Sequence, residues 1–267
     1  MKQLLQTVNT TLQTFGVDGL KAIRQLAGMP RYALEIMAFR RQWRHNPGGW
    51  VFGRWWPVMT DRTESAGVMS GHYFHMDLVM AQQVVKAAPK AHLDVGSRID
   101  GFVAHVATTM PVLVGDIRPV ESQHPNIRFV QVNLMEQATA EKLGQFPSVS
   151  CLHTLEHMGL GRYGDPLDPA GDEKALATLA ALTAPGGQLY LATPMGRERI
   201  EFNAQRVYGL PRLHDMLARN GFTITHFGYV NDQGHLVPTQ ELTPEFVEES
   251  QTFTFSCALI IARKAKA

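Results

Sequence analysis

The 267 residues include 25 lysines and arginines against 24 aspartates and glutamates, which gives a formal charge of +1 with histidine neutral. This near balance excludes a strongly basic nucleic-acid-binding protein at the level of the whole chain. Hydrophobic residues make up 45% and charged residues 18%, which excludes an intrinsically disordered chain and allows a sizeable core.

The near-neutral total hides a basic and aromatic N-terminal segment. Residues 1–62 hold nine bases against three acids. All four tryptophans of the chain lie there as well, namely Trp43, Trp50, Trp55 and Trp56. We expect a helical extension over residues 1–71. Because tryptophan beside arginine suits the lipid headgroup level, this extension either packs on the main domain or contacts a membrane surface or a protein partner.

Two helices are predicted in the extension. In the first, apolar residues recur at helical spacing and Gly16 stops the run; they are Leu4, Leu5, Val8, Leu12 and Phe15. In the second, Pro30 fits the first turn of a helix that reaches about Trp43 and ends within residues 45–49. The stretch WVFGRWWPVMTDR that follows is expected to be an aromatic loop or strand.

Over residues 72–267 helices and strands alternate, which predicts an α/β domain with a Rossmann-like, mostly parallel sheet of seven strands. The predicted helices are YFHMDLVMAQQVVKAA, GFVAHVATTM, DEKALATLAALTA and YGLPRLHDMLARNG. The first five predicted strands are AHLDVGS, PVLVGDI, IRFVQVNL, PSVSCLHTL and QLYLATP. The last two, FTITHFGYV and FTFSCALIIARK, have no predicted helix between them, so we expect them to pair antiparallel.

The sequence favours a cytoplasmic protein. It has no run of about 18 apolar residues, and its first residues lack both an unbroken apolar segment and a small-residue cleavage site. We therefore expect neither a transmembrane helix nor a secretory signal, while association with the inner face of a membrane stays open. The two cysteines, Cys151 and Cys257, lie in apolar strand-like runs and are expected to be buried, reduced thiols.

Glycine and polar residues follow the first three predicted strands, where open parallel sheets bind their ligands. The first strand ends at Asp94, and Gly96 lets the chain turn tightly beside a ligand. The second strand ends at Asp116, about 20 residues past that turn, where an acid holds the ribose hydroxyls of a nucleoside. The third ends near Asn133, whose amide suits an adenine edge. This pattern predicts a nucleoside-type ligand.

These motifs make residues 72–264 resemble the class I S-adenosylmethionine (SAM)-dependent methyltransferases. HLDVGS stands at their first motif, LVGDI supplies the second-strand acid, CLHTLEHMG resembles the fourth-strand motif, and LTAPGGQLYLATP resembles the element before strand five. The chain is most similar to an uncharacterised branch, a domain of unknown function, in which GLGRYGDP recurs. The resemblance implies SAM as cofactor, bound by Asp94, Gly96, Ser97, Arg98, Gly101, Asp116 and Asn133.

The chain departs from the family pattern in the glycine-rich turn. Arg98 and Asp100 stand where the second and third glycines of Gly-x-Gly-x-Gly fall, and Gly101 comes one place late. The backbone near the methionine part of the cofactor must therefore take another shape. Three partners are open for the Arg98 guanidinium, namely the cofactor carboxylate, the Asp100 carboxylate and solvent. Asn133 replaces the acid that is often found at the adenine.

The loop after the fourth strand carries the candidate catalytic residues. His153 or His157 is a candidate general base, because histidine titrates near neutral pH, and Glu156 is placed to orient it. In the alternative interpretation the histidine packs or orients the loop without reacting. No metal site is expected, because the spacing of the two histidines suits zinc on a helix but falls where a strand turns into a loop.

Candidate substrate-binding residues lie in two segments. Arg162 is suited to hold a phosphate or carboxylate, and Tyr163 and Asp165 crowd the expected substrate side. Asp165 also precedes a proline, which is ordinary turn chemistry. Before the first strand, Tyr73 and His75 either line the acceptor pocket or pack within a helix.

The predicted function is therefore a SAM-dependent methyltransferase that acts on a small-molecule or carbohydrate-type acceptor. In one alternative the fold binds another nucleotide-type ligand, such as a nucleotide sugar. In the other it is a non-catalytic, membrane-peripheral component of envelope polysaccharide assembly. Nucleic acid is not expected as a partner, and the oligomeric state stays open.

Overall fold

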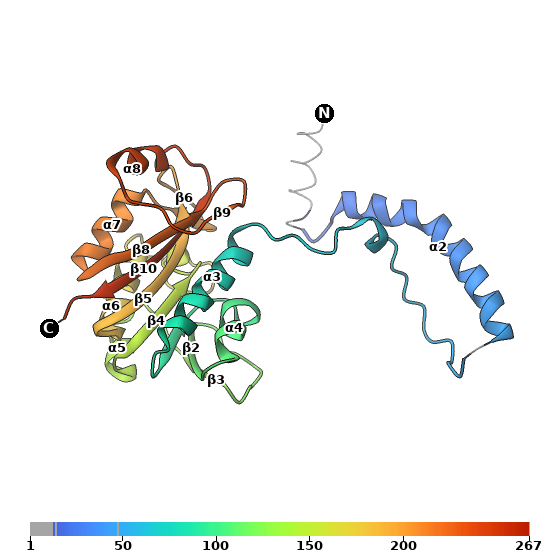
Figure 1. Ribbon diagram of the computed structural model, residues 1–267, viewed down its shortest axis with the longest axis horizontal. Helices are drawn as coiled ribbons and strands as arrows, with labels where there is room; N and C mark the ends of the chain where they lie inside the picture. Colours follow the sequence, from blue (N-terminus) through green and yellow to red (C-terminus); the bar gives the residue numbers. More distant parts are fainter. Residues whose placement is uncertain (1–12, 14, 47, 267) are drawn as a thin grey trace. The chain divides into compact units, whose positions relative to one another are not determined.

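The computed structural model describes residues 13, 15–46 and 48–266 (Figure 1). The chain divides into two units, Met1–Val68 and Met69–Ala267. The first predicted helix lies mostly outside the described residues, because Leu4, Leu5, Val8 and Leu12 are not among them.

The first unit is built on one long helix, α2 (Gly19–His45). Asp18 caps its N-terminus by accepting a hydrogen bond from the Lys21 amide at 2.9 Å. The helix ends at His45, as the sequence predicts, but Pro30 lies inside it, so the prediction that Pro30 begins a helix is wrong. None of the described residues of α2 is buried, so water can satisfy the carbonyl that the proline leaves without a donor.

The aromatic stretch after α2 is an exposed loop that leads to the short 3-10 helix η1 (Asp61–Thr63). The exposed fractions of its tryptophans are 80% for Trp50, 71% for Trp55 and 68% for Trp56. The guanidinium of Arg54 lies 4.5 Å from the centre of the Trp56 ring. The unit thus presents apolar and basic side chains together. No helix in the described part of the chain is both long and apolar enough to cross a bilayer.

The second unit surrounds one sheet of eight strands in the order β3-β2-β1-β4-β5-β10-β8-β9. The strands from β3 to β5 run parallel to one another. The bounds are β1 (His92–Val95), β2 (Val112–Asp116), β3 (Ile127–Gln131), β4 (Phe146–Leu152), β5 (Thr183–Met195), β8 (Phe222–Val230), β9 (Leu236–Val237) and β10 (Ser256–Lys264). The predicted Rossmann-like sheet is confirmed, and the two-residue β9 is added at its edge.

The C-terminal strand β10 lies between β5 and β8 and is antiparallel to both. The predicted antiparallel pairing of β8 and β10 is therefore right. The reason given for it is wrong, because helix α8 (Pro244–Ser250) lies between them in the chain. Thr243 caps α8, and the helix is too short for its apolar periodicity to stand out in the sequence.

Helices cover both faces of the sheet, as Figure 1 shows. One face is covered by α3 (His72–Ala87), the π-helical turn η2 (Ile99–Val103) and α4 (Ala104–Ala107), whose buried residues form one core cluster with the sheet. The other face carries α5 (Ala138–Leu143), α6 (Gly171–Leu182), α7 (Leu210–Arg219) and α8. Each fully buried large side chain in these clusters contributes about 2 kcal/mol to folding.

Helix α5 was not predicted, and neither were two shorter elements near the sheet. The 3-10 turn η3 (Leu155–His157) follows β4, and β6 (Arg199–Glu201) pairs with β7 (Gln205–Val207) in a separate hairpin. Both lie beyond the carboxyl ends of the parallel strands, next to one another in space, since β7 contacts η3. They therefore shape the region where the ligand site is expected.

The turn after β1 requires a glycine. Gly96 has a φ of 77°, and its amide donates to the Gly115 carbonyl at 2.8 Å. A Cβ at this position would run into the side chain of Thr154, which follows β4. The absence of a side chain at Gly96 thus lets the first strand turn directly against the fourth.

We expect Gly96→Ala to lower the free energy of unfolding by about 3 kcal/mol, because it combines backbone strain with overpacking. Gly186→Ala is the matched control, since Gly186 has a similar φ of 74° but a Cβ there would meet only ordinary contacts, the nearest being Lys266 at 3.7 Å. The control should lose about 1 kcal/mol from strain alone. Urea unfolding measures both, and equal losses would contradict the packing role of Gly96.

Candidate functional site

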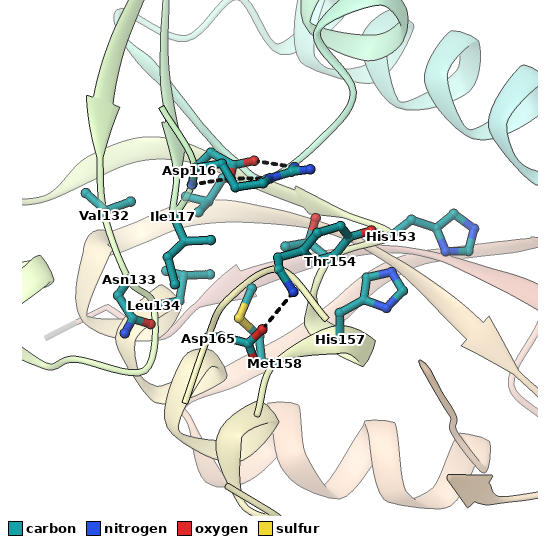
Figure 2. A pocket seen from close by; sticks show the side chains of 14 residues that line it. Asp116, Ile117, Val132, Asn133, Leu134, His153, Thr154, His157, Met158 and Asp165 are labelled. Atoms are coloured by element: carbon teal, nitrogen blue, oxygen red, sulfur yellow. Dashed lines mark hydrogen bonds and ion pairs between the residues drawn. The ribbon is translucent and has the colours of Figure 1, made fainter. Parts of the chain in front are cut away.

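Two adjoining cavities open at the carboxyl ends of the parallel strands. The first has a volume of about 520 Å³ when the space open to solvent at its mouth is included (Figure 2). It is lined by Val95, Gly96, Asp116, Ile117, Arg118, Val132, Asn133, Leu134, His153, Thr154, His157, Met158, Tyr163 and Asp165. The second holds about 1220 Å³ and extends past Tyr73, Ser97 and Arg98. Both therefore lie where an open α/β sheet binds its ligands.

The buried Asp94 carboxylate fixes the turn that forms part of the wall of these cavities. It is fully buried and accepts hydrogen bonds from the Ser97 hydroxyl at 2.5 Å, the Ser97 amide at 3.2 Å and the Ser150 hydroxyl at 2.5 Å. Burial raises the pKa of Asp94 to about 6. Asp94 lines neither cavity, so it positions the turn that carries Gly96 and Ser97.

Asp116 stands at the edge of both cavities, as the sequence predicts, but it is engaged by a neighbour. Arg118 donates to one carboxylate oxygen from Nε at 3.0 Å and to the other from Nη2 at 2.9 Å. The same guanidinium lies 4.4 Å from the centre of the Tyr163 ring. A ribose at Asp116 must share the carboxylate with Arg118. Sequence reasoning missed this residue, although its position two places after the strand-end acid was a signal.

Asn133 lines the first cavity, but its side-chain amide closes the turn that follows β3. Its Oδ1 accepts from the Met135 amide at 3.0 Å, and its Nδ2 donates to Glu136 at 3.1 Å. The apolar side chains beside it, Val132 and Leu134, give this end of the cavity a surface suited to a flat ring.

Of the two residues assigned to the cofactor in the glycine-poor turn, Arg98 lies at a cavity and Gly101 does not. Arg98 pairs with Asp100 through two hydrogen bonds of 3.1 and 3.0 Å and lies 4.9 Å from the centre of the Tyr73 ring, at the second cavity. Gly101 lies inside η2 and lines neither cavity. A Cβ there would collide with the carboxylate of Asp77 on α3, so this glycine serves the packing of two helices.

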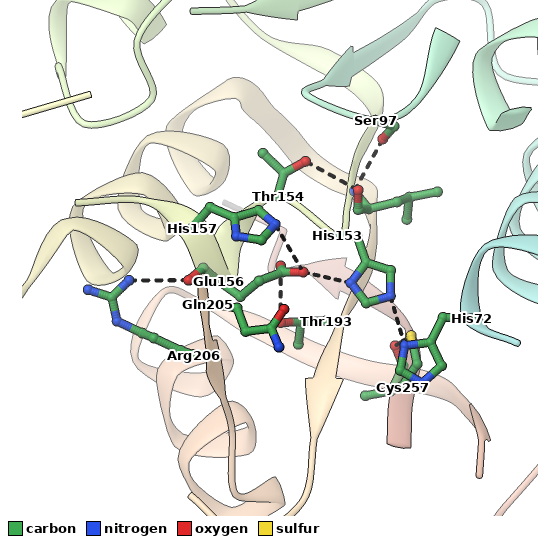
Figure 3. A network of polar contacts seen from close by, with 12 residues as sticks. His72, Ser97, His153, Thr154, Glu156, His157, Thr193, Gln205, Arg206 and Cys257 are labelled. Carbon is green, nitrogen blue, oxygen red and sulfur yellow. Dashed lines mark hydrogen bonds and ion pairs between the residues drawn. The ribbon is translucent and has the colours of Figure 1, made fainter. Parts of the chain in front are cut away.

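His153 is held between two side chains at the end of β4 (Figure 3). Its Nδ1 lies 2.6 Å from Oε1 of Glu156, and its Nε2 lies 3.2 Å from Nδ1 of His72. Although burial lowers it, the charges of Cys257 and Glu156 raise the pKa of His153 well above its usual range. The backbone of His153 has a φ of 49°, a strained conformation for a residue with a side chain. Glu156 thus orients His153, and neither ring nitrogen is left for an acceptor.

His157 keeps one nitrogen less engaged. Its Nδ1 donates to the Ala204 carbonyl at 2.7 Å, whereas its Nε2 is 3.7 Å from Glu156 Oε1. Its ring meets that of Tyr163 edge to face, with centres 5.4 Å apart. Burial lowers the pKa of His157, so the ring is neutral near pH 7. His157 lines the first cavity and is the better placed of the two rings to accept a proton.

The loop after η3 is tied down by two groups. Asp165 accepts from the amides of Gly159, Gly161 and Tyr163 at 2.7, 3.1 and 3.2 Å. Arg206, buried on β7, donates to the Met158 carbonyl at 2.6 Å. Sequence reasoning gave Asp165 a substrate-binding role, whereas its carboxylate is used by the loop itself.

The remaining candidate substrate residues divide into two groups. Tyr73 and Tyr163 line the second cavity, and Tyr163 lies between Arg118 and Arg162, whose guanidinium is 5.2 Å from the ring centre. Arg162 also donates to the Ala204 carbonyl at 2.9 Å. His75 lies on α3, where its ring packs edge-on against Phe74, and it lines neither cavity.

The buried Asp77 beneath this region has an incomplete set of hydrogen bonds. Its side chain is on α3, the residue is only 5% exposed, and Oδ1 has no hydrogen-bond partner in the described part of the chain. Burial raises the pKa of Asp77 from its ordinary 3.8 to about 6. The charged carboxylate therefore costs folding free energy at neutral pH.

Comparison with known proteins gives one family match. A family model described as "Caenorhabditis protein of unknown function, DUF268" matches residues 118–264. No curated protein matches the chain.

Solved structures share the fold of the second unit at low sequence identity. A 1,6-didemethyltoxoflavin-N1-methyltransferase from Burkholderia thailandensis, solved with its substrate and S-adenosylhomocysteine, has a TM-score of 0.51 and 17% identity over 88% of this chain and 90% of its own. The [4+2]-cyclase SpnF has a TM-score of 0.50 and 15% identity over 72% and 82%.

An O-methyltransferase family protein from Burkholderia thailandensis has a TM-score of 0.49 and 13% identity over 72% of this chain. The chain spans only 56% of the length of that protein. The neighbours with higher scores show that the second unit has the class I methyltransferase fold, and one of them is named for a cyclisation.

We expect Asp77→Asn to stabilise the protein at pH 8 by about 1–2 kcal/mol and to have little effect at pH 4. The carboxyl binds its proton more tightly in the folded state, so the native charge is costly only as the pH rises from 4 through 6. Asp100→Asn is the control, because pairing with Arg98 lowers the pKa of that exposed carboxyl and its removal should bring no gain at pH 8. Thermal melts of the three proteins between pH 4 and pH 8 measure these stabilities. An equal gain in the stability of Asp77→Asn at both pH values would contradict the burial argument.

Proposed function

With more than half of its residues matched by the family model, the chain belongs to the DUF268 family, and we propose that it is a SAM-dependent methyltransferase. The observation that carries the proposal is the cavity at the carboxyl ends of β1 and β2, with Gly96 at the first turn and Asp116 at the second. This is the place and residue pattern for a nucleoside in an open α/β sheet.

The residues around the cavity fit SAM. Gly96 brings the backbone close to the space, Asp116 offers a carboxylate to ribose hydroxyls, and Val132 and Leu134 supply apolar walls for the adenine. The second cavity continues from the first past Ser97 and Arg98, where a guanidinium suits the carboxylate of the methionine part. When bound, SAM would supply a methyl group already activated by the positive sulfonium.

The chain's own residues then have to orient an acceptor and exclude water. Tyr73 and Tyr163 offer ring faces in the second cavity, and Arg118 offers positive charge beside the Tyr163 ring. These groups suit a small or carbohydrate-type acceptor that carries hydroxyl or anionic groups. We assign His157 as the group that takes a proton from the acceptor, because its Nε2 is the less engaged ring nitrogen at the cavity.

The first test is binding, measured by isothermal titration calorimetry with SAM, S-adenosylhomocysteine and UDP-glucose. We expect S-adenosylhomocysteine to bind and Asp116→Ala to weaken it at least about tenfold, which corresponds to about 1.4 kcal/mol, because ribose hydroxyls lose a charged acceptor. Asp215→Ala is the control, since it breaks an exposed Arg219 pair on α7 away from the cavities.

Stronger binding of UDP-glucose than of both SAM compounds would replace the methyltransferase proposal by a nucleotide-sugar one. Unchanged affinity in Asp116→Ala would show that the nucleoside lies elsewhere.

We also propose that the first unit binds the anionic surface of a membrane. The proposal rests on the exposed aromatic loop and on the excess of bases in residues 1–62. Arg40 lies 4.6 Å from the centre of the Phe52 ring, so charge and aromatic surface occur side by side. Such a surface places rings at the headgroup level while its bases attract anionic lipids.

We expect the full chain to co-sediment with phosphatidylglycerol-containing vesicles and less with neutral phosphatidylcholine vesicles, with binding that falls as salt rises. Replacing Trp55 and Trp56 by Ser should weaken this binding about fivefold or more, because each ring contributes buried apolar area. Phe202→Ser, which removes an aromatic ring that is 74% exposed in the second unit, is the control. Equal sedimentation of all three proteins would rule out the loop as the contact.

A further inference from the structure

Three side chains from distant parts of the sequence meet beside the second cavity. His72 begins α3, His153 follows β4, and Cys257 lies on β10. One ligand atom from each lies within 4.8 Å of the other two (Figure 3). The His153 side chain is 6% exposed and Cys257 is fully buried, whereas His72 is only partly buried.

The outer nitrogen of each ring faces a group that can only accept a hydrogen bond. His72 Nε2 is 3.1 Å from the Phe255 carbonyl, so this nitrogen carries a proton. His153 Nδ1 is 2.6 Å from the Glu156 carboxylate and carries a proton as well. In two neutral imidazoles the inner nitrogens, His72 Nδ1 and His153 Nε2, are then both lone pairs. These atoms face each other at 3.2 Å, so either a proton on one of them or a metal ion must lie between them.

The charge of Glu156 requires the same compensation. The residue is 0% exposed, and in the described part of the chain its carboxylate contacts only His153, His157 and the Thr193 hydroxyl. Arg206 bonds main-chain carbonyls in this region and not the carboxylate. A buried carboxylate without a lysine or arginine is stabilised by a cation held nearby, which here is either the imidazolium of His153 or a metal ion.

We propose that His72, His153 and Cys257 form a binding site for Zn²⁺ or a similar borderline divalent cation. The donors would be His72 Nδ1, His153 Nε2 and Cys257 Sγ, the nitrogen and thiolate set that zinc prefers. A proton between the rings would satisfy the nitrogens, whereas a metal ion would also use the Cys257 sulfur, which lies within 4.8 Å of a ring nitrogen of each histidine. A divalent cation with the Cys257 thiolate and the Glu156 carboxylate makes the cluster neutral.

The observed distances fit this site. Bond lengths of about 2.0–2.1 Å and tetrahedral angles place two zinc-bound nitrogens about 3.3 Å apart, close to the 3.2 Å seen here. The same geometry requires nitrogen–sulfur distances of about 3.6 Å, whereas the present ones are at most 4.8 Å, so the thiol must move inward by about 1.2 Å at most.

The groups behind the ligands have the arrangement that tunes metal-binding histidines. Glu156 accepts from His153 and the Phe255 carbonyl accepts from His72, which fixes both tautomers with the inner nitrogens free for a metal. The described residues supply three ligands, which leaves a fourth position open, as in catalytic zinc sites. His153 also lines the second cavity, so this position adjoins the space assigned above to the acceptor.

The test is metal binding by the full chain under reducing conditions, without SAM or an acceptor. The protein is stripped with a chelator, reloaded with zinc sulfate, gel-filtered and analysed for metal. We expect one zinc ion per chain in the wild type and at least about a tenfold loss of affinity in His72→Ala, because a ligand is removed. His75→Ala is the matched control on the same helix and should keep wild-type binding.

Two further measurements separate ligation from loss of folding. Glu156→Gln should weaken zinc roughly ten- to hundredfold, as removal of a hydrogen-bond partner behind a ligand does. Cobalt substituted for zinc should show a thiolate charge-transfer band and the intense visible absorption of a tetrahedral ion, with the thiolate band absent in Cys257→Ser. Circular dichroism checks the fold of each variant.

No retained zinc in the wild type, or equal retention by His72→Ala, would overturn the site and leave a shared proton between the two rings. Because these readouts do not involve SAM, they fail or succeed independently of the methyltransferase proposal.

Discussion

The site of this protein depends on one buried carboxylate. Asp94 holds the turn after β1 through Ser97 and the neighbouring strand through Ser150, so β1 and β4 are fixed at the point where the cavities begin. The chain of hydrogen bonds continues from Ser150 to the buried ring of His92, whose pKa is lowered to about 3 by burial. Because Ser150 donates its hydroxyl proton to Asp94, neutral His92 donates a hydrogen bond to Ser150 from Nε2 and accepts one from Ser148 at Nδ1, so every donor in this row points toward Asp94.

That fixed turn supports the loop after β4. Thr154 packs against Gly96, and the strained His153 beside it is held by Glu156 and His72. Strain of this kind persists only where the surroundings determine the conformation. Here they do so from three sides, since the β1 turn, α3 and the hairpin of β6 and β7 all contact the loop.

The sequence predicts the sheet well because its strands are short apolar runs closed by turn residues. It also places Asp116 and Asn133 at the correct strand ends, since the carboxyl ends of parallel strands share one edge. It cannot tell what their side chains bond to, as Arg118 and the turn after Asn133 show. The family resemblance assigned Gly101 to the cofactor, whereas its lack of a side chain makes room for Asp77.

The cluster around His153 could not be read from the sequence, because its members are 81 and 104 residues apart and only the folded sheet brings them together. Membership of a family of unknown function was predicted and is confirmed by the family match, and the class I methyltransferase fold is shown by the structural neighbours. The short elements η3, β6 and β7 were missed, since two or three residues carry no periodicity.

The placement of β10 affects how the protein is made. Residues 256–264 are synthesised after all the other strands, yet they occupy the space between β5 and β8 and supply one layer of contacts to both. Until these residues are made, β5 and β8 therefore each expose an unpaired edge, which is prone to join other chains. The sheet closes only when β10 is in place, so Cys257 is the last of the three proposed zinc ligands to reach the site.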